Sequence, residues 1–291
     1  SKRRGGQKMV SRERSIDDQF LEICEDIKAT LRVSMLPAPF RLWSSNPKLL
    51  ELLWRHLRPN LETRFFEYAA DAIRKHAARM VWGQPVCHRI DVDEISLFTV
   101  QKCRLVINIH HYINPKLLLL VTALVETLRR HDFEPIRDAG LTSSISTGVP
   151  AEMPTIHFLE ESSLSQRKRN VLKEIQNILA LPEISTEYLG LAYCNGYLEQ
   201  AWSELKPFAQ TTTYQKFTQH LHLMARTLVH GLPFPLEISW NDFASIGMSG
   251  VEFLNWIIPA QDALPRLILN MAALKVGMDG LDDASRSPYP V

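Results

Sequence analysis

The sequence predicts an all-α protein made of two tandem copies of one helical unit, arranged as a pseudo-two-fold dimer with a cleft between the copies. Three observations support this prediction. Apolar residues recur at helical spacing along most of the chain, few segments alternate as strands do, and the second half repeats the first.

Helical patterns follow one another through the first half. Apolar side chains recur at helical spacing in residues 17–33. Asn46 followed by Pro47 predicts the start of the next helix, because Asn caps helices and Pro fits their first turn, and Pro59 predicts its end. Further helical patterns cover, in order, residues 61–80, 91–107 and 115–131.

Asn114 followed by Pro115 predicts that the last of these helices begins at residue 115. The periodicity then stops in residues 137–162, which contain glycines, serines, threonines and two prolines, and we interpret this segment as a linker. Helical patterns resume near Ser163, Thr186, Thr212, Trp240 and Pro259.

The second half aligns with the first, without a gap, at an offset of 148 residues. The match is visible where Leu-Trp-Arg-His-Leu-Arg-Pro, ending at Pro59, meets Ala-Trp-Ser-Glu-Leu-Lys-Pro, ending at Pro207. Seven matches in one register are too many for chance. The matched pairs are Ile27 and Ile175, Leu31 and Leu179, Phe40 and Tyr188, Leu50 and Leu198, Trp54 and Trp202, Leu57 and Leu205, and Pro59 and Pro207.

The predicted organisation therefore has four parts. A basic tail (1–16) precedes the first helical repeat (17–136), and the linker (137–162) leads to the second repeat (163–291). We expect the tail to be solvated, and an arm that binds nucleic acid or lipid is the alternative.

Charge and hydrophobicity exclude several classes of function. The chain has 33 basic and 32 acidic residues, so no electrostatic signature for nucleic acid or an anionic membrane is present. No apolar run reaches the roughly 18 residues that a membrane-spanning helix needs. The N-terminus lacks the apolar core of a secretory signal, and we therefore expect a cytoplasmic protein. Its four cysteines, at positions 24, 87, 103 and 194, are predicted to be free thiols in the core.

Local catalytic motifs are absent, and no cofactor or metal is expected. The sequence has no Gly-rich phosphate loop, no H-E-x-x-H and no G-x-S-x-G. His110-His111 has no carboxylate or Cys at ligand spacing, so both are interpreted as core or surface histidines.

Several segments resemble the group I 2-haloacid dehalogenases, over residues 20 to 291 and in the order that this family shows. The similar stretches are Glu25-Asp26-Ile27 with Thr30-Leu31-Arg32-Val33, Thr63-Arg64 with Ala69-Ala70-Asp71, Tyr112-Ile113-Asn114-Pro115-Lys116 with the apolar run 117–125, and Met278-Asp279-Gly280-Leu281 with Ala284-Ser285-Arg286-Ser287-Pro288-Tyr289-Pro290.

This resemblance implies a reaction. A carboxylate acts as general base on a water molecule, which displaces halide from C2 of a short 2-haloacid with inversion and without a covalent ester. The resemblance places the base in Thr186-Glu187-Tyr188, where Glu187 replaces the family's Asp. Asn114 then helps to position the water or the substrate, and Thr63 and Thr186 contribute to substrate binding.

The chain also departs from the family pattern. The resemblance aligns two aromatic pocket residues with Met35 and Ala38, and a third with Ala260, so the pocket is expected to be larger or to have changed its substrate. Glu187 also has a purely structural interpretation. It follows Ser185, in the first turn of a helix, where the macrodipole favours a carboxylate by roughly 0.3–1 kcal/mol.

Three functions follow from these alternatives. The first is a hydrolase acting on carbon–halide bonds through Glu187 and Asn114, with a small-molecule substrate. The second is a divergent member that binds a small apolar carboxylic acid without turnover, and the third is a different reaction in an enlarged pocket. We expect an enzyme that works as a homodimer and binds neither nucleic acid nor membrane.

Overall fold

The computed structural model describes residues 16–87, 95–156, 161–194 and 196–291. Within these residues all regular elements are helices, and the only β-type pairing is an isolated bridge between Thr63 and Ser144. The predicted all-α fold class is confirmed. Residues 1–15 of the predicted basic tail lie outside the described residues. No helix in the described part of the chain is long and apolar enough to cross a bilayer.

The helices fall into two similar series. The first half contributes α1 (Ile16–Leu31), α2 (Ala38–Trp43), α3 (Pro47–Leu61), α4 (Arg64–Trp82) and α5 (Leu97–Leu128). The second half contributes α7 (Gln166–Ile178), α8 (Thr186–Ala192), α9 (Tyr197–Ala209), α10 (Thr212–Val229) and α12 (Gly250–Asp279). Shorter elements are η1 (Pro85–Cys87), α6 (Ala139–Thr142), η2 (Glu161–Ser163), α11 (Trp240–Ser245) and α13 (Leu281–Ala284).

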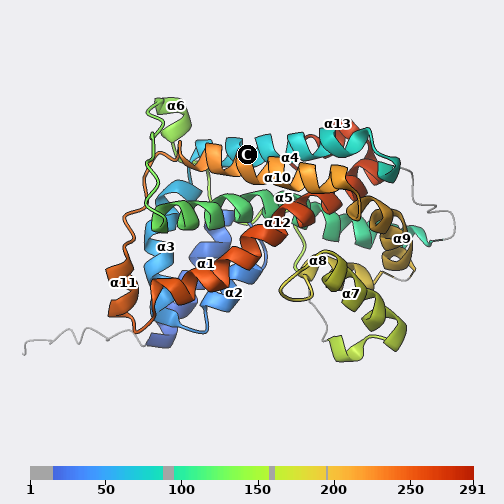
Figure 1. Cartoon of the computed structure of the whole chain (residues 1–291), viewed down its shortest axis with the longest axis horizontal. Coiled ribbons are helices and arrows are strands. Elements are labelled where there is room, and N and C mark those ends of the chain that lie inside the picture. Colours follow the sequence, from blue (N-terminus) through green and yellow to red (C-terminus); the bar gives the residue numbers. More distant parts are fainter. Residues whose placement is uncertain (1–15, 88–94, 157–160, 195) are drawn as a thin grey trace, which may run out of the picture.

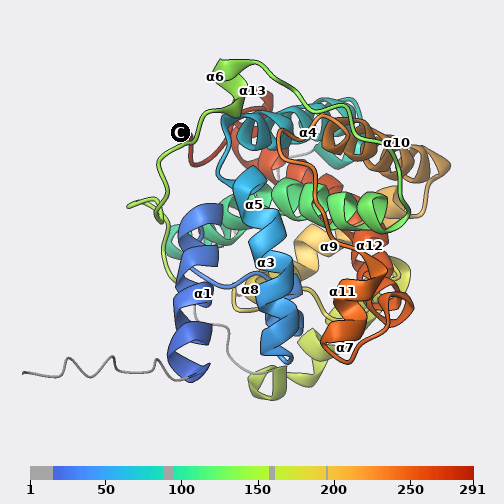
Figure 2. The same ribbon diagram turned by 90° about the vertical axis from the view of Figure 1, so that its left-hand side faces the viewer.

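The two longest helices, α5 and α12, pack against each other through the centre of the molecule (Figures 1 and 2). α4 of the first half packs on α12, and α10 of the second half packs on α5, so the two halves are interlocked. Residues 117–125 of α5 are buried on every side, which explains why this stretch is apolar throughout. Helices α1–α3 and α7–α9 form two groups on either side of this centre (Figure 1).

Side-chain contacts of the first half recur 148 residues later. The Trp54 indole donates to Asp26 Oδ2 at 2.7 Å, and the Trp202 indole donates to Glu174 Oε2 at 3.0 Å. Each carboxylate also forms an ion pair with the basic residue that lies one helical turn after the tryptophan. This residue is Arg58 in the first half and Lys206 in the second. Equivalent tryptophans therefore have equivalent partners.

The backbone repeats in the same register. The N-cap hydroxyls of Thr63 and Thr211 each accept a hydrogen bond from the third residue of the helix that follows. Arg32 and Ala180, which end the first helix of each series, both have positive φ angles, of 60° and 48°. These recurrences support the inferred duplication. The predicted domain boundaries stay predictions.

The predicted break at Pro115 is wrong, because α5 continues through it as one helix. Proline has no N–H, so the carbonyl of His111, four residues earlier, loses its usual helical partner. Arg74 on α4 replaces that partner, with Nε donating to His111 O at 2.8 Å and Nη2 donating to Tyr112 O at 2.9 Å. Pro259 likewise lies inside α12 and does not begin it.

The cysteine prediction is met in part. Cys103 and Cys194 are buried free thiols, and Cys24 is free but only partly buried.

Candidate functional site

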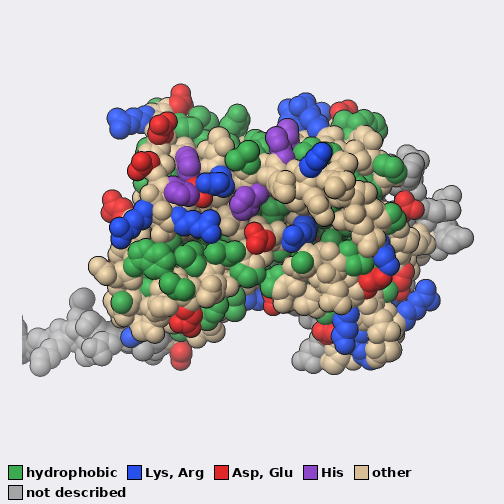
Figure 3. Space-filling view, viewed as in Figure 1, with side chains coloured by type: hydrophobic (Ala, Val, Ile, Leu, Met, Phe, Trp, Pro, Cys, Tyr) green, Lys and Arg blue, Asp and Glu red, His purple; other side chains and the backbone are tan. Residues whose placement is uncertain are grey.

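A largely apolar cavity lies where α5 and α12 meet the starts of α2 and α8. The helix groups that carry α2 and α8 are separated by a notch at the lower edge of the face in Figure 3, where acidic and basic side chains are interspersed. The cavity is lined by residues 33, 35–39, 41 and 42 around α2, 109, 110, 113, 114 and 117 of α5, 181–183 and 185–187 around α8, and 256, 260, 263, 264 and 267 of α12.

Glu187 and Asn114 meet inside this cavity although they are 73 residues apart. The Asn114 Nδ2 amide donates a 2.7 Å hydrogen bond to Glu187 Oε1. Both side chains are buried, with exposed fractions of 3% for Glu187 and 2% for Asn114. Glu187 lies in the first turn of α8, so the positive end of that helix stabilises its negative charge. The carboxylate is thus held by one of its oxygens in a mainly apolar setting.

Thr186 is fixed by a histidine that the sequence did not single out as a site residue. His110 Nδ1 lies 2.8 Å from the Val106 carbonyl of its own helix, and His110 Nε2 lies 3.1 Å from Thr186 Oγ1. Because a carbonyl can only accept, the ring proton is on Nδ1, and in the neutral ring Nε2 accepts the Thr186 hydroxyl proton. His110 therefore orients Thr186 at the cavity wall.

Two further polar side chains line the cavity. Ser185 is at the N-cap position of α8, but its side chain does not cap the helix, and its buried Oγ has no hydrogen-bond partner. Arg41, on α2, is the arginine among the cavity-lining residues. Arg41 is exposed to solvent at the cavity mouth, and its Nη1 donates to Leu36 O at 2.8 Å. Partial desolvation lowers the pKa of Arg41, whereas the charges of Glu183 and Glu187 raise it, and the guanidinium stays charged.

The remaining predicted site residues separate into two groups. Met35, Ala38 and Ala260 all line the cavity, and their contact with substrate stays a prediction. Thr63 does not line it. Its hydroxyl donates to Asn60 O at 2.7 Å and accepts from Phe66 N at 3.2 Å, so it serves as the N-cap of α4. The predicted substrate contact of Thr63 is therefore corrected to a structural role.

A buried charged network lies on the next turn of α5 after Asn114. Lys116 Nζ pairs with Glu67 and donates to the Tyr112 hydroxyl at 2.7 Å, which in turn donates to Glu67 Oε1 at 3.2 Å. Arg32 joins the network and binds the C-terminal segment through Tyr289 O at 3.0 Å. Burial lowers the pKa of Lys116 to about 8, although Glu67 opposes the shift. This network fixes the segment of α5 that carries Asn114.

Sequence reasoning missed His110, Ser185, Arg41 and Trp256 as cavity residues. The internal repeat could have indicated Ser185 and Arg41 as cavity residues. Ala38 and Thr186 begin α2 and α8 in equivalent positions, so the residues around both helix starts were candidates.

Comparison with known proteins gives consistent matches. Residues 34–188 match the family described as "Halocarboxylic acid dehydrogenase DehI". The chain is 28% identical over 281 residues to a configuration-inverting 2-haloacid dehalogenase of Alcaligenes xylosoxydans xylosoxydans, which covers 92% of both chains. It is also 28% identical to an (R)-2-haloacid dehalogenase of Pseudomonas putida, over 90% of both chains.

Solved structures show the same relationship. A mutant D-2-haloacid dehalogenase in complex with D-2-CPA matches with a TM-score of 0.82 and 28% identity, over 90% of this chain and 92% of that one. The complex of a D-2-haloacid dehalogenase with L-LA matches with a TM-score of 0.82 and 27% identity, over 95% of this chain and 99% of that one.

Proposed function

Because the chain belongs to the halocarboxylic acid dehydrogenase DehI family, which matches more than half of its residues, we propose that it hydrolyses the carbon–halide bond of 2-haloacids with inversion at C2. The observation that carries this proposal is the buried Glu187 carboxylate, held by Asn114 inside a mainly apolar cavity. A carboxylate in that position is a suitable general base for a water molecule.

In the proposed reaction, the second oxygen of Glu187 takes a proton from water while the water oxygen attacks C2 opposite the halogen. The carbon–oxygen bond forms as the carbon–halogen bond breaks, and halide leaves with the bonding electron pair. The product is a 2-hydroxyacid of opposite configuration, and the proton on Glu187 returns to solvent. The Asn114 amide keeps the base oriented, and a misplacement of about 1 Å can cost on the order of a hundredfold in rate.

Arg41 and Ser185 are proposed to hold the substrate carboxylate. Arg41 provides a positive charge at the cavity, and the Ser185 hydroxyl, which also lines it, is an unused hydrogen-bond donor. A guanidinium and a hydroxyl together suit a carboxylate, because charge-assisted hydrogen bonds are the stronger ones. With the carboxylate fixed, C2 is held at a defined place relative to Glu187.

The cavity walls favour substrates longer than two or three carbons. Met35, Ala38 and Ala260 stand where the resemblance expects aromatic side chains, and Glu187 extends one methylene farther than Asp. We propose that a bulkier 2-haloacid occupies the added space and restores the distance between water and C2. We expect weak turnover of two- and three-carbon haloacids and faster turnover of longer ones.

The experiment that tests the function is halide release by the purified protein. D- and L-2-chloropropionate and a series of longer 2-haloacids serve as substrates, with wild type and Glu187→Gln compared. The amide keeps the shape of the side chain but is a poor base, so Glu187→Gln should abolish turnover and keep the helical circular dichroism spectrum. Turnover by this variant near the wild-type rate would remove Glu187 from the mechanism.

A single turnover in ¹⁸O water tests direct attack by water. The label should enter the hydroxyacid in the first turnover. Label in the Glu187 carboxylate, detected by peptide mass, would instead require an ester intermediate.

A member that binds a small acid without turnover is not favoured, because the relatives found are dehalogenases by name and the carboxylate is retained. Halide release from none of the tested acids, with binding still measurable, would support that alternative. The cytoplasmic location and the homodimer remain proposals.

A further inference from the structure

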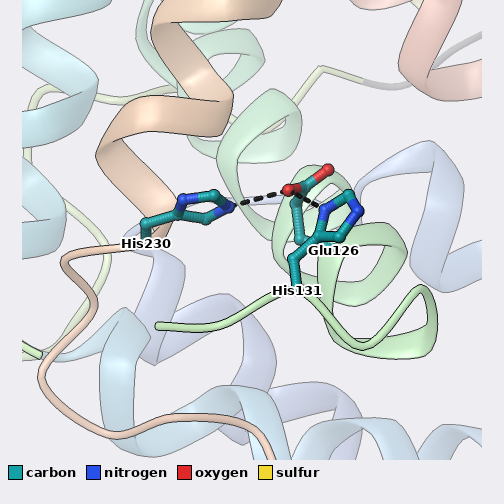
Figure 4. Close-up of side chains that lie close together, drawn as sticks. All are labelled: Glu126, His131 and His230. Carbon is teal, nitrogen blue, oxygen red and sulfur yellow. Dashed lines mark hydrogen bonds and ion pairs between the residues drawn. The ribbon is translucent and has the colours of Figure 1, made fainter. Parts of the chain in front are cut away.

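Three side chains outside the cavity converge on one point between α5 and α10 (Figure 4). Glu126 is near the end of α5, His131 lies in the turn that follows, and His230 is the C-cap residue of α10. His131 Nδ1 lies 2.5 Å and His230 Nε2 lies 2.7 Å from the same carboxylate oxygen, Oε2 of Glu126. One donor atom from each side chain thus lies within 4.8 Å of the other two.

The backbone holds both histidines in place. Arg130, in the left-handed region with φ of 57°, reverses the chain after α5, and the N–H of His131 then donates to Glu126 O at 3.0 Å. His230 is fixed from the other side, because the N–H of Glu134 donates to its carbonyl at 2.8 Å. The cluster is therefore built on anchored main chain.

The charges around the cluster leave Oε2 as the accessible ligand atom. The Glu126 side chain is 1% exposed, and Arg226 Nε donates to its other oxygen, Oε1, at 3.1 Å. Burial raises the pKa of Glu126, but hydrogen bonds from His131 and His230 and the charge of Arg226 outweigh this and lower it. Both imidazoles are about one-third exposed, so solvent reaches the cluster from one side.

We propose that Glu126, His131 and His230 bind one Zn²⁺ ion, with water as its fourth ligand. Two imidazole nitrogens and one carboxylate oxygen are ligands that Zn²⁺ accepts in a tetrahedral site. Ligand atoms in such a site lie roughly 3 Å apart, so each imidazole nitrogen moves away from Glu126 Oε2 by a fraction of an ångström when the ion enters.

Arg226 acts as the outer partner of this site. Its hydrogen bond to Oε1 fixes the carboxylate in a one-oxygen binding mode, as residues around metal ligands commonly do. The ion joins the end of α5 to the end of α10, and therefore the first half of the chain to the second. None of the three ligands lines the proposed substrate cavity, so the ion has a stabilising role and no part in the hydrolysis.

Zinc binding by the full chain tests the proposal. The protein is first treated with a chelator and dialysed, and ZnCl₂ is then titrated in a calorimeter. Thermal unfolding is followed with and without zinc. We expect one Zn²⁺ per chain and a higher melting temperature. His131→Gln and His230→Gln should each weaken binding at least tenfold and remove the melting shift, while halide release without zinc stays at the wild-type level.

His220→Gln is the matched control, because His220 is on the same helix, α10, and stacks on His76 away from Glu126. This variant should bind zinc as wild type does. Co²⁺ titration gives a second measurement, since a tetrahedral site produces strong visible absorption that both ligand variants should lose. Absence of stoichiometric zinc binding would reduce the cluster to a hydrogen-bonded clamp and overturn the proposal. Loss of zinc binding in His220→Gln, with zinc binding retained in His131→Gln and His230→Gln, would overturn it as well.

Discussion

The side-chain amide of Asn114 donates to the Glu187 carboxylate across the boundary between the two halves of the chain, at 2.7 Å. α5 supplies the amide and α8 supplies the carboxylate, so neither half contains a complete site. Helices of both halves provide the walls, and this one asymmetric pair provides the chemistry that we propose.

Replacing Asn114 should affect the chemical step more than substrate binding. In Asn114→Ala the buried carboxylate loses the donor that orients it, and we expect kcat to fall on the order of a hundredfold while KM changes by less than about threefold. Steady-state halide release on the best 2-haloacid measures both constants. Asn177→Ala, at an exposed asparagine on α7, serves as a control for amide loss. A rise in KM with an unchanged kcat would assign Asn114 to substrate binding instead.

Replacing Arg41 should have the opposite effect. Arg41→Gln keeps a polar, hydrogen-bonding side chain but removes the charge proposed to hold the substrate carboxylate. Loss of a charge-assisted hydrogen bond of about 1.5–3 kcal/mol predicts a KM at least tenfold higher, with kcat nearly unchanged. Arg55→Gln, an exposed arginine on α3, is the control. Equal KM values for Arg41→Gln and wild type would show that another group binds the carboxylate.

The sequence predicted well what depends on patterns within one helix. Apolar periodicity was enough for the all-α fold, and the 148-residue offset predicted that Trp54 and Trp202 have matching surroundings. The cavity positions of Met35, Ala38 and Ala260 came from the family resemblance, since nothing in their local sequence distinguishes them from other small or flexible residues.

The errors arose where a distant side chain decides a local structure. A proline normally interrupts a helix, so a boundary was predicted at Pro115. Arg74, 41 residues earlier, supplies the donor that keeps α5 continuous, and this could not be inferred from residues 91–131. His110 was treated as a packing residue because its partner, Thr186, is 76 residues away. The Thr63 error was avoidable, since a threonine directly before a helical pattern is a common N-cap.

Breaking the buried pair of Glu67 and Lys116 should destabilise the fold strongly. Glu67→Gln leaves the ammonium of Lys116, which is fully buried, without an anionic partner. Removing one partner of a buried pair costs about 3–5 kcal/mol of unfolding free energy, whereas replacing both with apolar groups costs much less. Urea unfolding of Glu67→Gln, Glu67→Leu, Lys116→Met and the double variant Glu67→Leu/Lys116→Met checks this, with the Leu and Met singles as the reference for the double variant. A double variant whose loss equals the sum of the single losses would contradict a direct coupling.

Acid should destabilise the protein through His111, which is buried on α5 three residues before Asn114. Burial, reinforced by the charge of Arg74, lowers the pKa of His111 to about 3, and its Nε2 donates to Ala284 O at 2.8 Å. In the unfolded chain the pKa is about 6.5, so between these values the unfolded state binds more protons, and stability decreases as the pH falls from about 6.5 towards 3. Between pH 7.5 and 5.5 this histidine alone should lower the free energy of unfolding by about 1 kcal/mol. The slope reaches about 1.4 kcal/mol per pH unit once the unfolded ring is charged. Urea unfolding at the two pH values should show that loss in wild type and in His220→Gln. His111→Gln, which is less stable at pH 7.5, should lose about 1 kcal/mol less unfolding free energy than wild type over the same interval. An equal loss in all three proteins would place the acid sensitivity elsewhere.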